Sequence, residues 1–166
     1  NTQQQTTLTN FLNVWEADPT DYKDPRWLAY MLATTYHETD KKFKAIEEYG
    51  KGKGRKYGTP HPETGKVYYG RGYVQLTWDY NYKKMSDLLG VDLYHNPELA
   101  LQDQYATPIL FTGMNRGLFT GKKLSDYFNG LKEDWVNARK IINGLDKANI
   151  IADYGRKFYA SISIIP

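Results

Sequence analysis

Most of the chain has the residue spacing of helices, and one stretch rich in glycine and aromatic residues interrupts it. This pattern constrains the fold most strongly. In "DPRWLAYMLATTYHE", Asp24 suits the N-cap position and Pro25 suits the first turn of a helix. The apolar face of this helix would contain Leu28, Met31, Leu32 and Thr35. We therefore predict a helix that continues to Glu38 and buries one face.

Other segments show helical spacing or helix stop signals. Near the N-terminus, a short amphipathic helix would carry Leu8, Phe11, Leu12 and Trp15 on one face. Two further helices are expected over 79–90 and 96–117, the second beginning at Pro97 and kinked at Pro108. We also predict a helix over 132–144 and a last helix from Lys147 to Ile162.

The segment "HPETGKVYYGRGYVQLTW", residues 61–78, differs from the rest of the chain. It has a turn signal at Thr64 and Gly65, followed by β-branched and aromatic residues interrupted by Gly70 and Gly72. We predict a hairpin or small sheet here and a loop over 41–57. Together these elements indicate an α+β, predominantly α-helical fold in a single domain over residues 1–166.

Composition narrows the classes of partner. The chain has 15 tyrosines and 4 tryptophans, more than a core of this size needs, which suggests a ligand surface lined with rings. It has no cysteine, which excludes disulfides and thiolate sites. Its formal net charge of +3 favours a polyanion such as cell wall, nucleic acid or anionic membrane. No apolar run approaches about 18 residues and no signal peptide is visible, so we expect no stable membrane insertion.

Three glutamates lie around the junction between the predicted helix and the following loop. Hydrolysis of a glycosidic bond uses one protonated carboxyl group, which gives its proton to the leaving oxygen, and one ionised carboxylate, which activates water. Glu38 follows an apolar helix and should be partly desolvated, as a carboxyl group kept protonated must be. Glu47 or Glu48, in a lysine-rich segment, should stay ionised. A single glutamate is usually only a solvated surface residue, so the neighbouring motifs carry the hypothesis.

Two polar residues of the aromatic stretch could assist this chemistry. The hydroxyl group of Thr77 could orient a water molecule, although an ordinary strand threonine is the more frequent case. Arg71, between Gly70 and Gly72, could clamp a carboxylate or form a structural salt bridge.

Motifs for other chemistries are incomplete. "HETDK" lacks the second histidine of a helical zinc site, and "GKGKGRKYG" lacks the spacing of a phosphate-binding loop. We therefore expect no metal and no cofactor. The cluster of Lys51, Lys53, Arg55 and Lys56 is more typical of a solvated loop than of a nucleic-acid site.

With these motifs assembled, the chain resembles glycoside hydrolase family 19 in its bacterial and phage branch, which has a lysozyme-like fold. "YHET" resembles the family's His-Glu-Thr, which implies that Glu38 is the general acid. "AIEEYG" resembles the segment of the general base, which implies Glu48 with Glu47 as a rival. "YYGRGYVQLTWDYNY" resembles the family signature in which the residue at Thr77 binds the nucleophilic water. Substrate contacts are implied for His37, Glu47, Tyr69, Arg71, Gln75 and Asn81, with looser matches at Asn143 and Arg156.

The departures from the family pattern favour the phage lysins over the plant chitinases. Asp40, Lys41 and Lys42 stand where plant chitinases have glycines, and the plant disulfides have no counterpart. The resemblance implies a monomeric, inverting endolysin that cleaves the β-1,4 glycan of peptidoglycan at the bacterial cell wall. Chitin is the alternative substrate, and a catalytically inactive wall-binding module or a nucleic-acid binder are the alternative classes.

Overall fold

The structure, a computed structural model, describes residues 1–19 and 23–162 and divides into two compact units. One unit comprises Asn1–Phe43 and Phe111–Pro166, and the other comprises Lys44–Leu110. The chain passes between the units twice, and the second of these points falls within helix α4 (Asp103–Arg116). The single catalytic domain expected over residues 1–166 stays a prediction.

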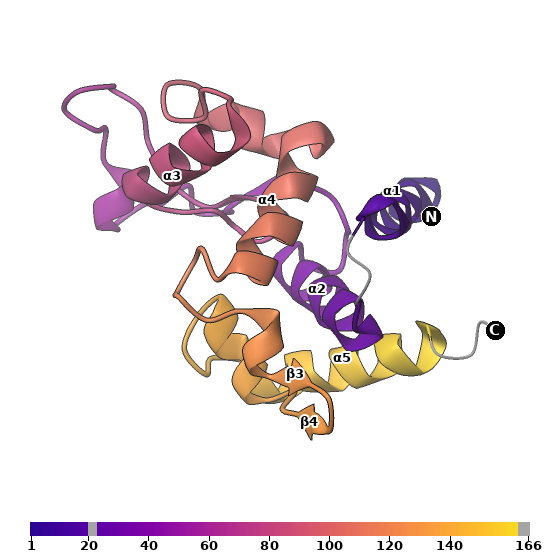
Figure 1. Cartoon of the computed structure of the whole chain (residues 1–166). Coiled ribbons are helices and arrows are strands. Elements are labelled where there is room, and N and C mark those ends of the chain that lie inside the picture. The colour runs from indigo at the N-terminus through magenta and orange to yellow at the C-terminus, as the bar shows by residue number, and fades with distance from the viewer. Residues whose placement is uncertain (20–22, 163–166) are drawn as a thin grey trace. The chain divides into compact units, whose positions relative to one another are not determined.

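The first unit is built on three of the predicted helices, α1 (Thr2–Ala17), α2 (Pro25–Glu38) and α5 (Ala148–Ile162). The Asp24 side chain accepts a hydrogen bond from the backbone N–H of Arg26, which confirms the predicted N-cap of α2. Helices α2 and α5 run side by side (Figure 1), and their contact is the most extensive between any two elements.

Helix α2 is buried on more than the one predicted face. The predicted stripe is buried, but Tyr30, Ala33 and Thr34 are buried as well. On α5 the buried positions include Ile151 and Gly155. The neighbouring Ile150 is exposed, because successive helical residues point about 100° apart and Ile151 takes the inward position.

Gly155 is required by this packing. A Cβ atom built on Gly155 would lie 2.7 Å from the ring of Trp135, which is itself buried. The absence of a side chain therefore lets α5 approach this ring closely.

The predicted helix over 132–144 is wrong in its first half. Strands β3 (Phe128–Asn129) and β4 (Lys132–Glu133) form an antiparallel pair, and only a 3-10 helix, η4 (Asn137–Ile141), follows. The buried residues Ala138 and Ile141 are three positions apart, a spacing that suits a 3-10 helix as well as an α-helix. A further short 3-10 helix, η3 (Leu124–Asp126), precedes β3.

The second unit contains α3 (Asp79–Leu89), which ends at Gly90 in the left-handed conformation, as predicted. The helix predicted over 96–117 is instead two elements, the 3-10 helix η2 (Pro97–Leu101) and α4. The break falls at Gln102, whose backbone is extended and whose carbonyl accepts from Tyr105 and Ala106 at the start of α4.

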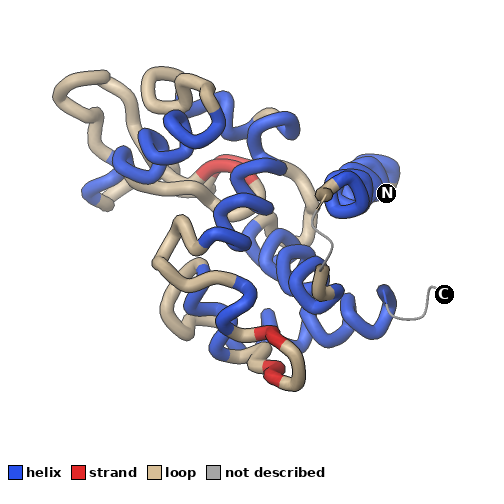
Figure 2. The backbone as a smooth tube through the Cα atoms, in the orientation of Figure 1, coloured by secondary structure: helices blue, strands red, loops and turns tan. Residues whose placement is uncertain are grey.

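The predicted hairpin over 61–78 is present only in part. Its turn forms, since the Gly65 N–H donates to the His61 carbonyl at 2.8 Å. Its strand, β2 (Arg71–Gly72), pairs with β1 (Ile46–Glu47), which lies in the segment predicted to be a loop. Figure 2 shows how little of the chain is strand, and the remaining connections include the 3-10 helix η1 (Lys56–Gly58).

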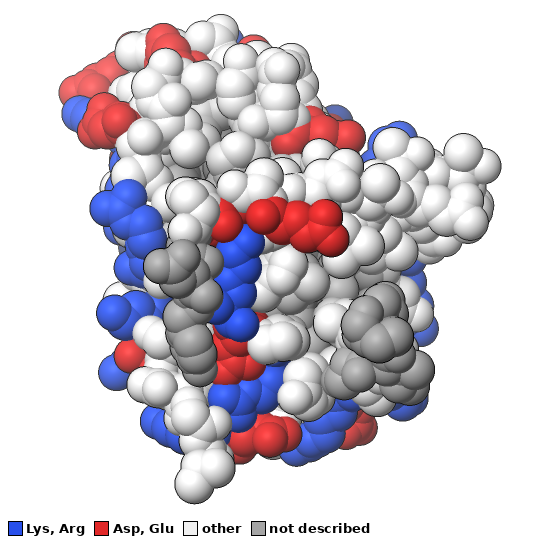
Figure 3. Space-filling model, turned by 45° about the vertical axis from the view of Figure 1, so that its right-hand side comes forward, with Lys and Arg blue, Asp and Glu red and all other residues white. Residues whose placement is uncertain are grey.

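The surface carries both signs of charge. On the face shown in Figure 3, basic and acidic side chains lie interspersed, so the net charge does not gather into one continuous field there. Among the described residues, no helix combines the length and the apolar character that crossing a membrane requires.

A buried ion pair at the start of α2 generates the first prediction. Asp24 receives hydrogen bonds from Arg26, which also donates to the carbonyls of Gly130 and Lys132 at the β3–β4 turn. Burial alone would raise the pKa of Asp24, but the hydrogen bonds and charge of Arg26 outweigh it and lower this pKa.

We expect Asp24→Asn to lower the free energy of unfolding by about 2 kcal/mol at neutral pH. Because the folded pKa of Asp24 lies below its unfolded value, its contribution is complete above that unfolded value and is lost as the pH falls through the folded pKa. Urea titrations at neutral pH and near pH 3 measure both effects. Equal destabilisation at the two pH values would contradict the assigned ion pair.

Candidate active site

Glu38 lies at the last position of α2, and a buried arginine holds its carboxylate. The Nη1 of Arg139 donates to Oε1 of Glu38 at 2.8 Å, and the Nε of Arg139 donates to the carbonyl of Asp146 at 3.0 Å. Arg139 is 3% exposed, and the side chain of Glu38 is 17% exposed. Glu38 is therefore partly desolvated, as expected. Its carboxylate also pairs with the Arg139 guanidinium, which the sequence did not indicate.

His37 is half-buried beside this pair. Burial lowers the pKa of His37, and Arg139 adds to that effect, whereas the neighbouring Glu38 opposes it. The imidazole is therefore neutral at pH 7, with one nitrogen to donate and one to accept a hydrogen bond. Such a group suits the binding of an uncharged hydroxyl or amide.

Glu47, in β1, is surrounded by charged and polar partners. Its Oε1 accepts from the Tyr69 hydroxyl at 2.7 Å, its Oε2 lies 3.2 Å from Nζ of Lys51, and the Nε of Arg71 lies 3.9 Å from Oε1. The hydrogen bond from Tyr69, with the Lys51 ammonium, lowers the pKa of Glu47 against the opposing effect of burial. Glu47 is thus ionised and committed to neighbouring side chains.

Glu48 has neutral partners instead. The backbone N–H of Gly70 donates to Oε2 at 3.1 Å, and the Tyr57 hydroxyl donates to Oε1 at 3.3 Å. Burial and the neighbouring Glu48 both raise the pKa of Tyr57, so this phenol keeps its proton at neutral pH. The carboxylate is oriented through both oxygens, and each oxygen retains a lone pair for a further donor.

A hollow of about 390 Å³ lies next to these two glutamates. Apolar, acidic and basic residues line it, and they are Lys44, Ala45, Ile46, Glu47, Glu48, Tyr49, Lys51 and Leu101. It is large enough for a small polar ligand.

Arg71 lies in the interior of the second unit. Its guanidinium carbon is 3.8 Å from the centre of the Tyr69 ring, and Nη1 donates to the Val67 carbonyl and the Tyr82 hydroxyl, both at 3.0 Å. It is only 5% exposed. Of the two sequence hypotheses for Arg71, these contacts favour the structural role, in which it supports Tyr69 beside Glu47.

The backbone around Thr77 is fixed by the other polar residues of the signature. The amide of Gln75 donates to the carbonyls of Ile46 at 2.9 Å and Gly72 at 3.0 Å. The amide of Asn81 donates to the Thr77 carbonyl at 2.9 Å, and the Thr77 hydroxyl donates to the Gln75 carbonyl at 2.7 Å. The Thr77 oxygen can therefore only accept from a further partner.

Gly70 leaves room for this arrangement. A Cβ atom at Gly70 would lie 2.9 Å from Oε1 of Gln75. The glycine thus allows the Gln75 side chain to pass close to the backbone that donates to Glu48.

The two weakest sequence matches have local partners. Asn143 is exposed, and its side chain accepts from the N–H of Gly144 at 2.8 Å. Arg156, on α5, is exposed and lies 3.3 Å from Asp153 on the same helix. The backbone N–H of Asn143 also donates to the carbonyl of Arg139 at 3.0 Å, whereas the side-chain contacts given for the two residues involve only Gly144 and Asp153.

Sequence reasoning missed Arg139 and Tyr57, the residues that hold the two candidate catalytic carboxylates. Arg139 is 101 positions from Glu38 in a segment predicted to be helical, and Tyr57 lies in a glycine-rich loop. Neither has a local pattern that would identify it. Among residues 1–19 and 23–162, no three His, Asp or Glu side chains converge as metal ligands would.

Comparison with known proteins identifies the family. A family model described as chitinase class I of glycoside hydrolase family 19 matches residues 26–112, slightly more than half of the chain. The chain belongs to glycoside hydrolase family 19. The match includes Glu38, Glu48 and Thr77.

Relatives of the family 19 chain include plant proteins. It is 43% identical over 75 residues to an endochitinase of Arabidopsis thaliana, covering 45% of this chain and 26% of that protein. It is 52% identical over 40 residues to inactive chitinase-like protein 1 of Hevea brasiliensis, covering 24% of this chain and 13% of that protein. The chain thus spans about a quarter or less of the length of these relatives, one of which is named inactive.

Solved structures confirm the predicted fold class, which is predominantly helical with small antiparallel sheets. Chitinase C from Streptomyces griseus matches with a TM-score of 0.63 at 26% identity, over 95% of this chain and 83% of that chain. A bacterial family 19 chitinase matches with a TM-score of 0.70 at 24% identity, over 97% of this chain and 87% of that chain. The second likeness concerns the fold alone.

The contrast between the adjacent glutamates generates a prediction. Glu47→Gln removes a charge that faces Lys51 and Arg71, and we expect it to lower the free energy of unfolding by about 1 kcal/mol. Glu48→Gln should cost less, because its amide oxygen can accept from Gly70 and its NH₂ can donate to the Tyr57 oxygen. Urea denaturation of the two variants provides the comparison. A larger loss for Glu48→Gln would contradict the different roles of their partners.

Proposed function

We propose that this chain is a glycosidase that cleaves a β-1,4-linked glycan with inversion of configuration, and that the glycan is bacterial peptidoglycan. The observation that carries the proposal is the difference between two carboxylates within the family match. Glu38 is held by a buried arginine at one oxygen, whereas Glu48 is held at both oxygens by neutral donors. Inverting hydrolysis needs two carboxyl groups with different tasks.

Glu38 is the proposed general acid. Because Oε1 accepts from Arg139, the proton to be delivered is carried by Oε2. Arg139, fixed at the Asp146 carbonyl, limits the orientations of the carboxyl group and so positions that proton. The proton passes to the glycosidic oxygen as the bond to the anomeric carbon breaks.

Glu48 and Thr77 are the proposed base and water-positioning residue. Since the Thr77 hydroxyl donates to Gln75, its oxygen can hold a water only by accepting one of the water's hydrogens. The other hydrogen would point to Glu48, which takes it up during the attack. Both hydrogens of the water are then engaged, and a lone pair on its oxygen is directed to the anomeric carbon.

The charge near Glu48 favours peptidoglycan over chitin. The exposed cationic side chains of the loop after Glu48 are those of Lys51, Lys53, Arg55 and Lys56. Chitin is uncharged, whereas the peptide stems of peptidoglycan carry carboxylates that such a loop attracts. The proposal therefore has three parts. The substrate is peptidoglycan, the enzyme acts at the bacterial cell wall as the resemblance to phage lysins implies, and the active form is a monomer.

Chitin is the second candidate substrate. It is favoured by the names of the relatives, which include endochitinases of plants and chitinase C of Streptomyces griseus. No contribution from a cofactor or a nucleic acid enters either proposal.

Substitutions at the three proposed catalytic residues test the mechanism. We expect Glu38→Gln and Glu48→Gln each to reduce glycan cleavage at least about a hundredfold, with the fold intact by circular dichroism. Thr77→Val should also reduce cleavage, whereas Thr77→Ser should retain most of it because a hydroxyl group remains. Turbidity loss of purified cell walls gives the rates. Near-normal lysis by Glu38→Gln would exclude Glu38 as the acid, and a wild type that binds cell walls but cleaves neither them nor chitin would indicate a binding module.

The stereochemistry has its own measurement. Proton NMR of fresh digests should show the anomer opposite to that of the substrate bond, and a crystal structure should place the Glu38 and Glu48 carboxyls about 6.5–9.5 Å apart. Retention of configuration, or a separation of about 5–5.5 Å, would contradict inversion.

Substrate choice is tested by digesting peptidoglycan and chitin oligomers in parallel. We expect cleavage of peptidoglycan that weakens with added salt, and mass spectrometry of the new reducing ends names the bond. Replacing Lys53, Arg55 and Lys56 by glutamine should raise KM for peptidoglycan and remove most of the salt dependence. Cleavage of chitin alone, with peptidoglycan untouched, would overturn the peptidoglycan assignment.

A further inference from the structure

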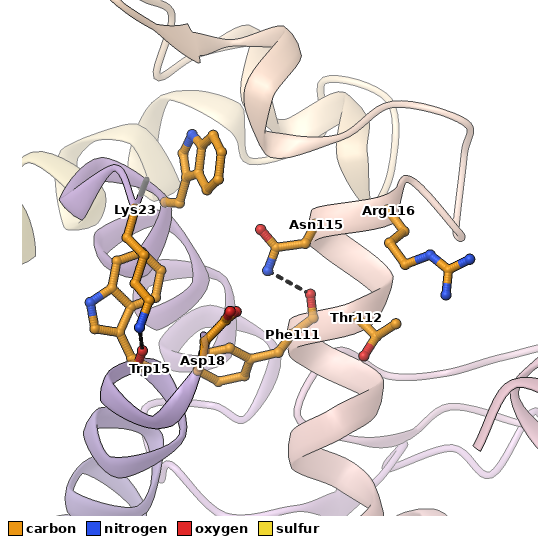
Figure 4. A pocket seen from close by; sticks show the side chains of 8 residues that line it. Trp15, Asp18, Lys23, Phe111, Thr112, Asn115 and Arg116 are labelled. Carbon is orange, nitrogen blue, oxygen red and sulfur yellow. Dashed lines mark hydrogen bonds between the residues drawn. The ribbon is translucent and has the colours of Figure 1, made fainter. Parts of the chain in front are cut away.

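A second cavity lies in the first unit, lined by residues with no part in the proposed mechanism. It has a volume of about 350 Å³ and is bounded by the end of α1, the start of α2 and the last turns of α4. Its lining residues are Trp15, Asp18, Lys23, Trp27, Phe111, Thr112, Asn115 and Arg116. Figure 4 shows this cavity from close by.

Three aromatic rings form its walls, and each is held by a separate contact. Lys23 donates to the Trp15 carbonyl, and its Nζ lies 5.7 Å from the centre of the Trp15 ring. The indole N–H of Trp27 donates to the carbonyl of Phe128 at 3.0 Å. Phe111 makes an edge-to-face contact with the buried ring of Phe11 at 5.9 Å. Each aromatic residue therefore has at least one contact within the protein before any ligand arrives.

Polar groups lie among these rings. In Figure 4 the Asn115 side chain extends from α4 toward the side of the cavity that carries Trp15 and Lys23, and Asp18 is a further lining residue. The Asn115 amide nitrogen donates to the Phe111 carbonyl at 2.8 Å, which fixes the amide and leaves its oxygen as an acceptor. Thr112 adds a hydroxyl group, and the guanidinium of Arg116 points away from the centre (Figure 4).

Indole rings combined with carboxylate, amide and hydroxyl groups suit one class of ligand. A pyranose ring has a face of C–H groups that packs on an indole, and hydroxyl and N-acetyl groups at its edge that hydrogen-bond to such side chains. The volume of the cavity falls in the range of about 300–1,000 Å³ of small-ligand sites. The ligand class that fits is therefore an oligosaccharide of N-acetylated sugars.

We propose that the Trp15–Trp27–Asn115 cavity is a second glycan-binding site, separate from the candidate catalytic residues, for a β-1,4-linked chain of N-acetylated sugars. The inference rests on the proposed glycosidase function for the identity of the ligand. A polymeric substrate presents many equivalent sugars, so a second point of attachment raises the local concentration of cleavable bonds at the enzyme.

The four tryptophans of the chain provide reporters for the test. The indole N–H signals of the ¹⁵N-labelled full chain, carrying Glu38→Gln to prevent cleavage, are followed by NMR during titration. Trp15 reports the cavity, and Trp78 reports the signature segment that contains Thr77. Trp135 is 2% exposed and serves as the internal reference. One titration uses N-acetylglucosamine oligomers, and a second uses disaccharide-repeat fragments of peptidoglycan.

We expect the Trp15 signal to shift saturably with at least one probe while Trp135 stays fixed, and the probe that acts distinguishes a chitin-like from a peptidoglycan ligand. Asn115→Leu, which keeps the size of the side chain, should raise the Kd at Trp15 at least about fivefold and leave the Trp78 titration unchanged. Asn13→Leu, at an exposed position of α1 outside the cavity, is the matched control and should change neither.

The outcomes separate the two proposals. A Trp15 signal that stays fixed while Trp78 saturates, or a Trp15 shift that Asn115→Leu leaves unaltered, overturns the second site and retains the proposed function. Saturation at Trp15 with no response at Trp78 and no cleavage by the wild type supports the second site and contradicts the proposed enzyme. If neither signal responds to either probe, the second site fails, and the proposed function fails with it only if the wild type cleaves neither glycan.

Discussion

The packing of α2 against α5 is the constraint on which the first unit depends. Helix α2 is buried around most of its circumference, and Gly155 brings α5 close enough for the Trp135 ring to fill the remaining space. A helix enclosed in this way has little freedom to rotate or shift, because protein interiors are close-packed. Glu38 is the last residue of α2, so its backbone is held by this packing. Arg139 then orients the Glu38 carboxylate by a hydrogen bond.

The second unit achieves order by a different route. Each strand of its sheet is only two residues long, so few backbone hydrogen bonds join the strands. Hydrogen bonds from side chains take their place. Gln75 and Asn81 each donate to backbone carbonyls, and Arg71 ties Tyr69 to the interior. Gln75 and Trp78 have positive φ values of 57° and 76°, a conformation that costs free energy and that surrounding contacts must impose. This strain lies on both sides of Thr77.

The two candidate glycan-binding regions use aromatic residues in different ways. In the signature segment, Tyr69 is tied to Glu47 through its hydroxyl and to Arg71 through its ring face, so it organises charged groups. In the second cavity, Trp15, Trp27 and Phe111 contribute ring surface, and Asp18, Lys23 and Arg116 line the same cavity. The high tyrosine and tryptophan content therefore reflects more than one surface. Part of it serves the core as well, since Tyr30, Tyr73 and Tyr82 are buried.

Local patterns along the chain were sufficient for the helices with clear caps, such as α2 after Asp24 and α3 before Gly90, and for the family signature around Thr77. Those features depend on residues a few positions apart, and the sequence records them directly. The β1–β2 pairing, the β3–β4 pair and the break at Gln102 escaped prediction, because each depends on distant partners or on turns without a distinctive signal. The same reason explains why the sequence indicated Glu38 and Glu48 as candidates but not the residues that hold them. Arg139 and Tyr57 acquire their roles only when folding brings them beside a carboxylate, and no spacing in the chain encodes that approach.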